Sequence, residues 1–266
     1  MLSNTLLTAY VALVGLIIGS AINAIVWRLY VGRSWVKGRS MCPECKHELG
    51  AKDLVPVISW LMLRGRCRYC KAKIHWQYPV VELATALLFG LSTYAMAPAD
   101  LGGAVRIVLW LIILTLLIIL AVYDARWMIL PDKIMVPAIL IALVYVGAEM
   151  LRLQSLTVGR GPLLAALVGG GAFYALVAAT KGRAMGGGDI KLVFLMGLLV
   201  GLKGLALALM FAFDVAAIVG LTLIALKLRK RRDHIAFGPF LVAGTIITFL
   251  YGHDIVQWYL HFNGLA

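Results

Sequence analysis

Long apolar segments recur along this chain and constrain its fold more than any other feature. A membrane-spanning helix needs roughly 20 mostly apolar residues. On that basis we expect eight spanning helices, at residues 5–27, 79–97, 105–123, 134–151, 162–180, 190–202, 204–226 and 239–258. Hydrophobic residues make up 62% of the chain and charged residues only 14%, whereas charged residues are about a quarter of a soluble domain. The sequence therefore predicts an all-α polytopic membrane protein, with its sixth and seventh segments divided near Lys203 and Gly204.

Basic residues are distributed unevenly among the connecting loops. Of the 25 Lys and Arg residues, 21 fall in the loops at 28–78, 124–133, 181–191 and 227–236. Because positive charge marks the cytoplasmic face of a membrane protein, we expect these loops in the cytoplasm and both termini outside. The net charge of +13 then reflects topology and contact with anionic membrane lipid, so no nucleic-acid partner is expected. No Lys or Arg precedes the first apolar segment, which predicts an uncleaved signal-anchor.

Two aspartates occupy similar positions at the ends of apolar segments. Asp189 follows three glycines, Gly186, Gly187 and Gly188, and Asp124 ends the third apolar segment. Successive glycines permit backbone conformations closed to other residues and let another chain approach closely. Each aspartate by itself could simply cap or end its helix. Their shared placement on the expected cytoplasmic side favours a common function, because an acid at the membrane boundary is costly unless it is solvated, paired or used.

Other acids are weaker candidates. Glu82 lies one turn inside the second segment. It is either an interfacial carboxylate favoured by the helix dipole or a functional group, and the sequence favours neither interpretation. Asp132 follows Pro131 and is expected to cap the fourth helix. Asp214 falls near the middle of the seventh segment. It is the main competitor to the Asp124 and Asp189 pairing, or else a buried protonated acid.

The only long polar segment, about residues 28–78, contains all four cysteines. Cys42 and Cys45 form one Cys-x-x-Cys pair, and Cys67 and Cys70 form the other, with 21 residues between the pairs. This arrangement is typical of a tetrahedral zinc site. Stable disulfides are disfavoured in a cytoplasmic loop, and neither pair lies in a thioredoxin-like pattern of a redox-active site. We therefore expect a small cytoplasmic zinc-binding domain, stabilised by a structural metal because the loop is short.

A pair of aspartates at one membrane surface favours an aspartyl hydrolase. Two carboxylates a few Å apart share a proton, so one can act as a base toward water and the other as an acid toward a peptide carbonyl. The sequence has no Ser/His/Asp arrangement and no His-Glu-x-x-His metalloprotease motif. The alternatives are a membrane transporter, with the aspartates on an ion pathway, and a zinc-bearing assembly scaffold. A test of peptide cleavage would distinguish the hydrolase from both.

The motifs of the chain, taken together, resemble those of a known family. Gly186-x-Gly188-Asp189 is similar to the signature of the intramembrane aspartyl proteases. The others resemble motifs of the bacterial type IV prepilin peptidases: Gly19-Ser20 with Asn23 and Arg28, the two Cys-x-x-Cys pairs, Tyr78-Pro79-x-x-Glu82, Asp124 with Pro131-Asp132, Gly186 to Lys191, and Phe237-Gly238-Pro239-Phe240. These matches run in order through nearly the whole chain. One departure is Arg28-Leu29-Tyr30, where the family usually has Arg-x-Pro.

The resemblance implies a bifunctional enzyme of the bacterial inner membrane, with its active site toward the cytoplasm. Such an enzyme cuts the basic leader from type IV prepilins or type II secretion pseudopilins after a glycine, with Asp124 and Asp189 as the catalytic pair. It then methylates the new N-terminus, using S-adenosylmethionine. No Gly-x-Gly-x-x-Gly nucleotide motif follows a strand here, so the residues of a methyl-donor site are not predicted. The residues expected to contact substrate are Gly186, Gly187, Gly188 and Glu82.

Three functional parts are expected along the chain. They are a first transmembrane helix at residues 1–27, a cytoplasmic zinc-binding loop domain at 28–78, and a transmembrane aspartyl peptidase core at 79–266.

Overall fold

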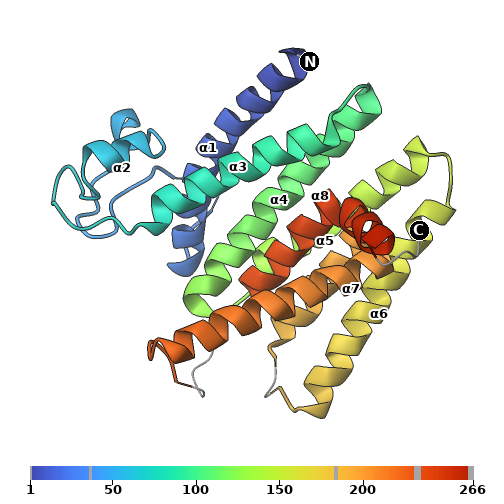
Figure 1. Cartoon of the computed structure of the whole chain (residues 1–266). Helices are drawn as coiled ribbons and strands as arrows, with labels where there is room; N and C mark the ends of the chain where they lie inside the picture. Colours follow the sequence, from blue (N-terminus) through green and yellow to red (C-terminus); the bar gives the residue numbers. More distant parts are fainter. Residues whose placement is uncertain (1, 36–37, 183–184, 231–234, 263–266) are drawn as a thin grey trace. The chain divides into compact units, whose positions relative to one another are not determined.

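The computed structural model describes residues 2–35, 38–182, 185–230 and 235–262, which contain eight α-helices, one 3-10 helix and no β-strand (Figure 1). Seven of the helices in these ranges are long and apolar enough to cross a membrane. The predicted all-α polytopic fold is therefore confirmed. The chain divides into two compact units, Met1–Gly103 and Ala104–Ala266, each of which is described by itself below.

The first unit is built on two long antiparallel helices. Its elements are α1 (Leu2–Tyr30), the 3-10 helix η1 (Ala51–Asp53), α2 (Ile58–Met62) and α3 (Gln77–Met96). Helices α1 and α3 lie side by side (Figure 1). A Cβ atom added to Gly19 would lie 2.6 Å from the Cα of Glu82, and one added to Gly15 would lie 2.9 Å from the Cα of Ala86. Small residues at such contacts let the two backbones approach closely, as is common between membrane helices.

The second unit is organised around a buried helix. Its elements are α4 (Leu101–Trp127), which begins just before the unit, α5 (Asp132–Arg152), α6 (Thr157–Ala179), α7 (Gly187–Ala225) and α8 (Gly238–Phe262). Trp110, Ile113 and Leu117 of α4 have no exposed surface. The Trp110 ring stacks on Phe249 of α8, with ring centroids 3.6 Å apart. Helix α4 therefore supplies much of the core, and its end is a rigid place for a functional side chain.

Helix α7 is longer than a membrane is thick. Its 39 residues would extend about 58 Å at 1.5 Å per residue, against a hydrocarbon core of about 30 Å. Its regular geometry is interrupted at Gly201, whose φ of 67° and ψ of −178° are not helical. Before this break Gly197 packs on Ala166 of α6, and after it Ala208 packs on Gly244 of α8.

The two halves of α7 correspond to the two predicted segments at 190–202 and 204–226. The break occurs at Gly201, whereas the sequence placed it near Lys203 and Gly204. Glycine suits the break because its φ of 67° lies in the left-handed region that other residues avoid.

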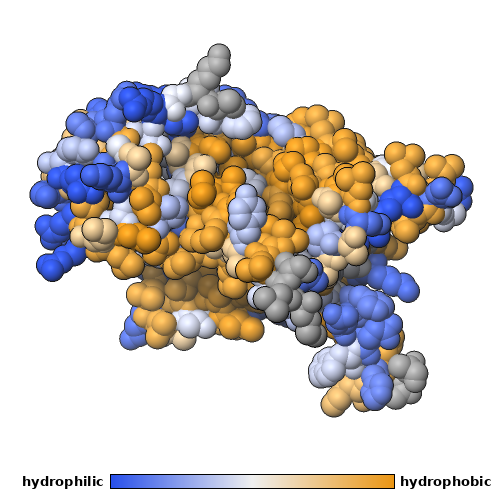
Figure 2. Space-filling model, turned by 90° about the horizontal axis from the view of Figure 1, so that it is seen from above, coloured by the Kyte–Doolittle hydropathy of each residue, from blue (hydrophilic) through white to orange (hydrophobic). Residues whose placement is uncertain are grey.

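Apolar side chains cover much of the surface that Figure 2 displays. Leu13 and Ile17 of α1, for example, are 61% and 64% exposed, which is expected where a helix faces lipid. The compact units divide at Gly103, so that α3 belongs with α1 and the polar loop. The predicted division into residues 1–27, 28–78 and 79–266 was based on the expected role of each part, whereas the two compact units are defined by their internal contacts. The three-part division stays a prediction.

Candidate active site and metal centre

Asp124 lies in the last turn of α4 and is only 6% exposed. Its Oδ2 atom accepts a hydrogen bond from the backbone N–H of Gly238, the first residue of α8, at 2.9 Å. A Cβ atom added to Gly238 would lie 2.7 Å from this same oxygen. Only glycine therefore allows the start of α8 to approach the Asp124 carboxylate this closely.

Asp189 is the third residue of α7 and is half-buried. Its Oδ2 atom accepts a hydrogen bond from the backbone N–H of Gly186 at 3.1 Å. This bond is the helix-capping interaction that the sequence left open as an alternative to catalysis. The bond fixes the position of the carboxylate at the helix start, so capping and a catalytic role are compatible.

The segment that follows α4 connects the two aspartates. A Cβ atom added to Gly188 would lie 2.9 Å from the Cβ of Leu130, in the link between α4 and α5. Lys191 Nζ lies 2.6 Å from Asp132 Oδ1, which joins α7 to the first residue of α5. Asp189 directly follows Gly188, and Leu130 lies in the segment that directly follows Asp124 and α4, so these contacts join the helix ends that carry the two aspartates. The structure thus brings the predicted pair together, and their catalytic role stays a prediction.

The glycines before Asp189 act differently from the sequence-based expectation. Gly186 has ordinary extended φ and ψ of −80° and 156°, and neither Gly187 nor Gly188 is among the glycines with positive φ. Unusual backbone conformations are therefore not the reason for this run. Gly188 is required because Leu130 approaches it too closely for a side chain. Gly186 and Gly187 are exposed, so their backbone is accessible.

The other acidic candidates lie in different surroundings. Asp214 is exposed in the second half of α7, beyond the Gly201 break. Asp132 does not cap α5 as predicted, because the N-cap position is occupied by Pro131 and has no side-chain bond. Asp132 forms its ion pair with Lys191 instead.

Glu82 is buried in the first unit, with 6% of its surface exposed. Its Oε2 atom accepts a hydrogen bond from the backbone N–H of Val57 at 2.7 Å. Nearby, Asn23 of α1 donates from its side chain to the carbonyl oxygen of Tyr78 at 3.1 Å. Glu82 therefore joins the polar loop to the α1/α3 pair. Its predicted contact with substrate stays a prediction.

The four cysteines lie on two similar knuckles, which the sequence analysis did not recognise as a structural repeat. In the first, Lys46 N donates to Cys42 O, and in the second Lys71 N donates to Cys67 O, each at 3.0 Å. Both lysines have φ of 60°. Each knuckle is also closed by an antiparallel bridge, Met41 with Glu48 and Arg66 with Lys73. Corresponding residues of the two knuckles, such as Cys42 and Cys67, are 25 positions apart in the chain, and this repeat is visible in the sequence.

The cysteine side chains form a cluster that fits a tetrahedral metal. All four are free thiols, and their Sγ atoms lie within 4.8 Å of one another. The Cys42 and Cys70 Sγ atoms are 3.8 Å apart, and a Zn–S bond of about 2.3 Å implies a tetrahedral S···S edge of about 3.8 Å. Burial alone would raise the pKa of Cys67, but backbone N–H groups of Cys70 and Tyr69 and the neighbouring thiols lower that pKa to about 7. The thiolate needed for metal binding is thereby favoured.

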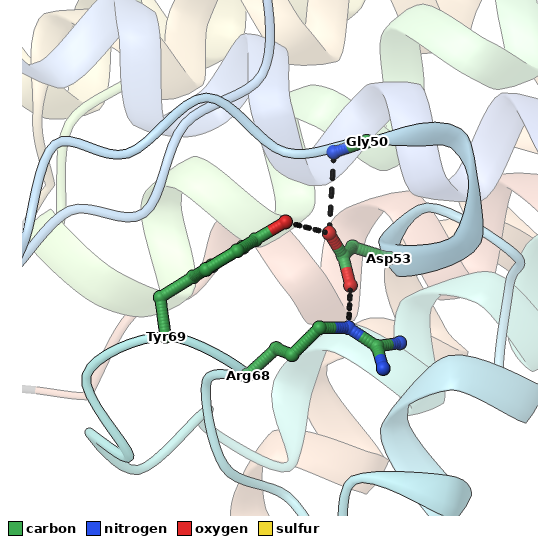
Figure 3. Close-up of polar contacts among 4 residues, drawn as sticks. All are labelled: Gly50, Asp53, Arg68 and Tyr69. Carbon is green, nitrogen blue, oxygen red and sulfur yellow. Dashed lines mark hydrogen bonds and ion pairs between the residues drawn. The ribbon is translucent and has the colours of Figure 1, made fainter.

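Asp53 ties the second knuckle to the segment after the first (Figure 3). Its carboxylate accepts hydrogen bonds from Arg68 Nε at 2.6 Å, Tyr69 Oη at 3.1 Å and Gly50 N at 3.2 Å. The Arg68 guanidinium is the main reason that the pKa of Asp53 is lowered, with Gly50 N–H and the Tyr69 hydroxyl adding to it. Arg68 and Tyr69 lie between Cys67 and Cys70, so this contact orients the metal-binding turn. Asp53 is not predicted from the sequence, because nothing near it in the chain marks Arg68 and Tyr69 as its partners.

Comparison with known proteins gives two family matches in consecutive parts of the chain. Residues 13–96 match the Bacterial Peptidase A24 N-terminal domain, and residues 111–221 match the Type IV leader peptidase family. The chain is 33% identical to the prepilin leader peptidase/N-methyltransferase of Bacillus subtilis (strain 168), over 92% of this chain and 95% of that protein. It is 31% identical to proteins of the same name from Aeromonas hydrophila, over 94% and 92%, and Pseudomonas aeruginosa, over 95% and 93%. No solved structure matches.

Proposed function

Because the chain belongs to the type IV leader peptidase family, we propose that it cleaves the leader of type IV prepilins or pseudopilins with Asp124 and Asp189 as an acid–base pair. The observation that carries this proposal is the convergence of the two carboxylates. One ends α4, the other begins α7, and the contacts of Gly188 with Leu130 and of Lys191 with Asp132 join these two helix ends. Each is held by a backbone N–H, from Gly238 and Gly186 respectively, so the pair is positioned before substrate binds.

The chemistry follows from two carboxylates that share one proton. The ionised carboxylate takes a proton from a water molecule while the oxygen of that water attacks the peptide carbonyl carbon. The protonated carboxyl donates a hydrogen bond to the carbonyl oxygen and so stabilises the tetrahedral intermediate. When the C–N bond breaks, a proton passes from the first carboxyl to the leaving amine. The exposed backbone at Gly186 and Gly187 is where we place the extended substrate segment.

We place the active site at the cytoplasmic face of a bacterial inner membrane. This orientation rests on the basic loops and on a topology of eight crossings, in which the two halves of α7 cross separately. Both termini then lie outside. Asp124 and Asp189 lie at helix ends, so a leader at the membrane surface can reach them without entering the middle of the bilayer.

The cysteine cluster is the proposed site of one structural zinc ion. The ion, when bound, cross-links the two knuckles through Cys42, Cys45, Cys67 and Cys70, whose sulfur separations fit it. The zinc has no part in peptide hydrolysis in this proposal. It stabilises a loop of about 50 residues that has little core of its own.

The names of the relatives also support N-methylation of the new N-terminus, for which S-adenosylmethionine is the expected methyl donor. The described residues contain no β-strand, so they do not form the strand–glycine loop–helix unit that commonly binds nucleotide cofactors. The present residues therefore assign no donor site, and no step of methyl transfer is derived.

The test is cleavage by the purified full-length protein in lipid nanodiscs, with a prepilin as substrate and mass spectrometry of the product's N-terminus. Asp124→Asn and Asp189→Asn should each lower the cleavage rate by at least about 10²–10⁴-fold, the usual contribution of a general acid or base. Asp214→Asn is the matched control, because it removes a third intramembrane carboxylate, and it should cleave normally. Near-normal turnover by either dyad variant would contradict the assignment. A transporter or a scaffold would cleave nothing in any form.

A further inference from the structure

The short helix α2 presents an apolar face that the described residues of its own unit do not cover. Ile58, Leu61 and Met62 are 56%, 61% and 79% exposed. Their spacing of three and four residues puts them on one face of the helix. The neighbouring Leu54 and Val55 are exposed as well. Contiguous apolar side chains of this kind outside a protein core mark a surface that meets another apolar phase.

The opposite face of α2 is the one that packs against the metal-binding loop. Trp60 is half-buried, and its Nε1 donates to the carbonyl oxygen of Ile74 at 3.2 Å. A Cβ atom added to Gly65 would lie 3.0 Å from the Trp60 ring. The loop thus fixes which way α2 is turned, and it turns Ile58, Leu61 and Met62 outward.

The start of α2 is fixed at the depth of the membrane-spanning helices. Val57, which precedes α2, donates its backbone N–H to Glu82 at 2.7 Å, and Glu82 lies five residues inside α3. Gly19 of α1 contacts Glu82, and it lies nine residues before Arg28, the first basic residue of the chain. At 1.5 Å per residue, the Cα of Glu82 beside Gly19 therefore lies about 13 Å nearer the start of α1 than Arg28 does, on the membrane side of that arginine, and the Val57 amide lies within the length of one glutamate side chain of it.

The basic residues that follow α2 are consistent with a position at the membrane boundary. Arg64 and Arg66 follow α2 directly and are exposed. Basic residues beside an apolar face favour the boundary between anionic headgroups and acyl chains. Val57 has φ of 59°, which a β-branched residue rarely adopts, and the bond to Glu82 is made by the N–H of this same residue.

We propose that α2 is an interfacial helix, with Ile58, Leu61 and Met62 inserted into the lipid leaflet next to the metal-binding loop. Glu82 then acts as a positioning residue that holds α2 at this depth. The loop is thereby attached to the membrane at a third place, in addition to its two connections to α1 and α3. This inference does not depend on the proposed catalytic pair.

The test uses a photoreactive residue in the full chain. p-Benzoylphenylalanine replaces Met62, and in a matched control it replaces Glu44, an exposed residue of the first knuckle that no contact fixes near α1 or α3. Each protein is reconstituted without substrate into nanodiscs of phosphatidylethanolamine and phosphatidylglycerol, irradiated, and analysed by mass spectrometry. We expect phospholipid adducts from the protein with the photoreactive residue at position 62 and none from the protein with it at position 44. No lipid adduct at position 62, or equal yields at both positions, would overturn the proposal.

A second measurement distinguishes lipid from other occupants. Adducts from position 62 to a second copy of the chain, or to added prepilin with none to lipid, would also overturn the proposal. Leu61→Asp in the position-62 protein should lower the lipid-adduct yield about tenfold, because exposing one leucine side chain changes its partition between lipid and water by at least that factor. Retained zinc shows that the loop of this variant still folds. An unchanged adduct yield in that zinc-loaded variant would exclude insertion of the α2 face.

Discussion

Replacing Gly238 by alanine tests the link between the start of α8 and the Asp124 carboxylate. The added Cβ would lie 2.7 Å from Asp124 Oδ2, 3.0 Å from Cγ and 3.2 Å from Cβ, whereas ordinary contact begins at 3.4 Å. The whole carboxylate lies against this position, so rotation of one atom cannot relieve the overlap. Either the Asp124 side chain or the start of α8 must move, and the bond between Gly238 N and Oδ2 at 2.9 Å is lost in both cases.

The magnitude can be worked from these contacts. A hydrogen bond to a charged group contributes about 1.5–3 kcal/mol, and overpacking a well-packed site costs about 1–3 kcal/mol. The better helix propensity of alanine offsets at most about 1 kcal/mol. Gly238→Ala should therefore lower the free energy of unfolding by about 2–5 kcal/mol. Because the carboxylate is displaced, cleavage should fall as well, and by more than the folded fraction does.

The assay combines cleavage in nanodiscs with equilibrium unfolding in mixed detergent. Gly147→Ala is the matched control, because this glycine lies inside α5 and its added Cβ would meet nothing within 4 Å. It should leave cleavage unchanged and alter stability by no more than about 1 kcal/mol. In an Asp124→Ala background the cost of Gly238→Ala should shrink, since the group it displaces is gone. Additive stability effects, or a Gly238→Ala protein with normal cleavage, would refute the reasoning.

Three further predictions follow from the other contacts. Gly188→Ala should reduce cleavage and stability, because its Cβ would lie 2.9 Å from the Cβ of Leu130, while Gly187→Ala, with nothing within 4 Å in the protein itself, should leave stability unchanged in the same unfolding assay. Asp53→Asn should destabilise the cysteine loop by about 1–2 kcal/mol. The pKa of Asp53 in the folded protein is lowered mainly by Arg68. In unfolding measurements, the stability difference from wild type should therefore reach its full value above about pH 4, the pKa of an unfolded aspartate, and disappear as the pH falls through the lower pKa of the folded protein. Removal of metal by a chelator should increase hydrogen exchange throughout the cysteine loop, and elemental analysis should find one zinc per chain before treatment; folded, reduced protein without zinc would contradict the metal assignment.

Local patterns in the sequence were sufficient to predict the spanning helices and to single out the candidate residues of the two sites. An apolar run long enough to cross a membrane satisfies its own backbone hydrogen bonds as a helix, whatever its neighbours are. The spacing of Cys42, Cys45, Cys67 and Cys70 likewise predicted that the four thiols cluster, because each Cys-x-x-Cys pair lies within one turn of chain. Asp124 and Asp189 were found because acids at the ends of apolar segments are rare and costly.

The tertiary structure alone decided which groups hold these residues in place. Gly238 is 114 residues from Asp124 and Val57 is 25 from Glu82, and no periodicity relates residues so far apart. The sequence also could not place the break in α7 at Gly201, since the apolar pattern continues through it. It suggested unusual backbone conformations and close approach of another chain for the glycines before Asp189, but it could not show that Gly188 is approached by Leu130 of this same chain. Composition and spacing determine which elements form, but close approach between them depends on packing, which only the folded chain specifies.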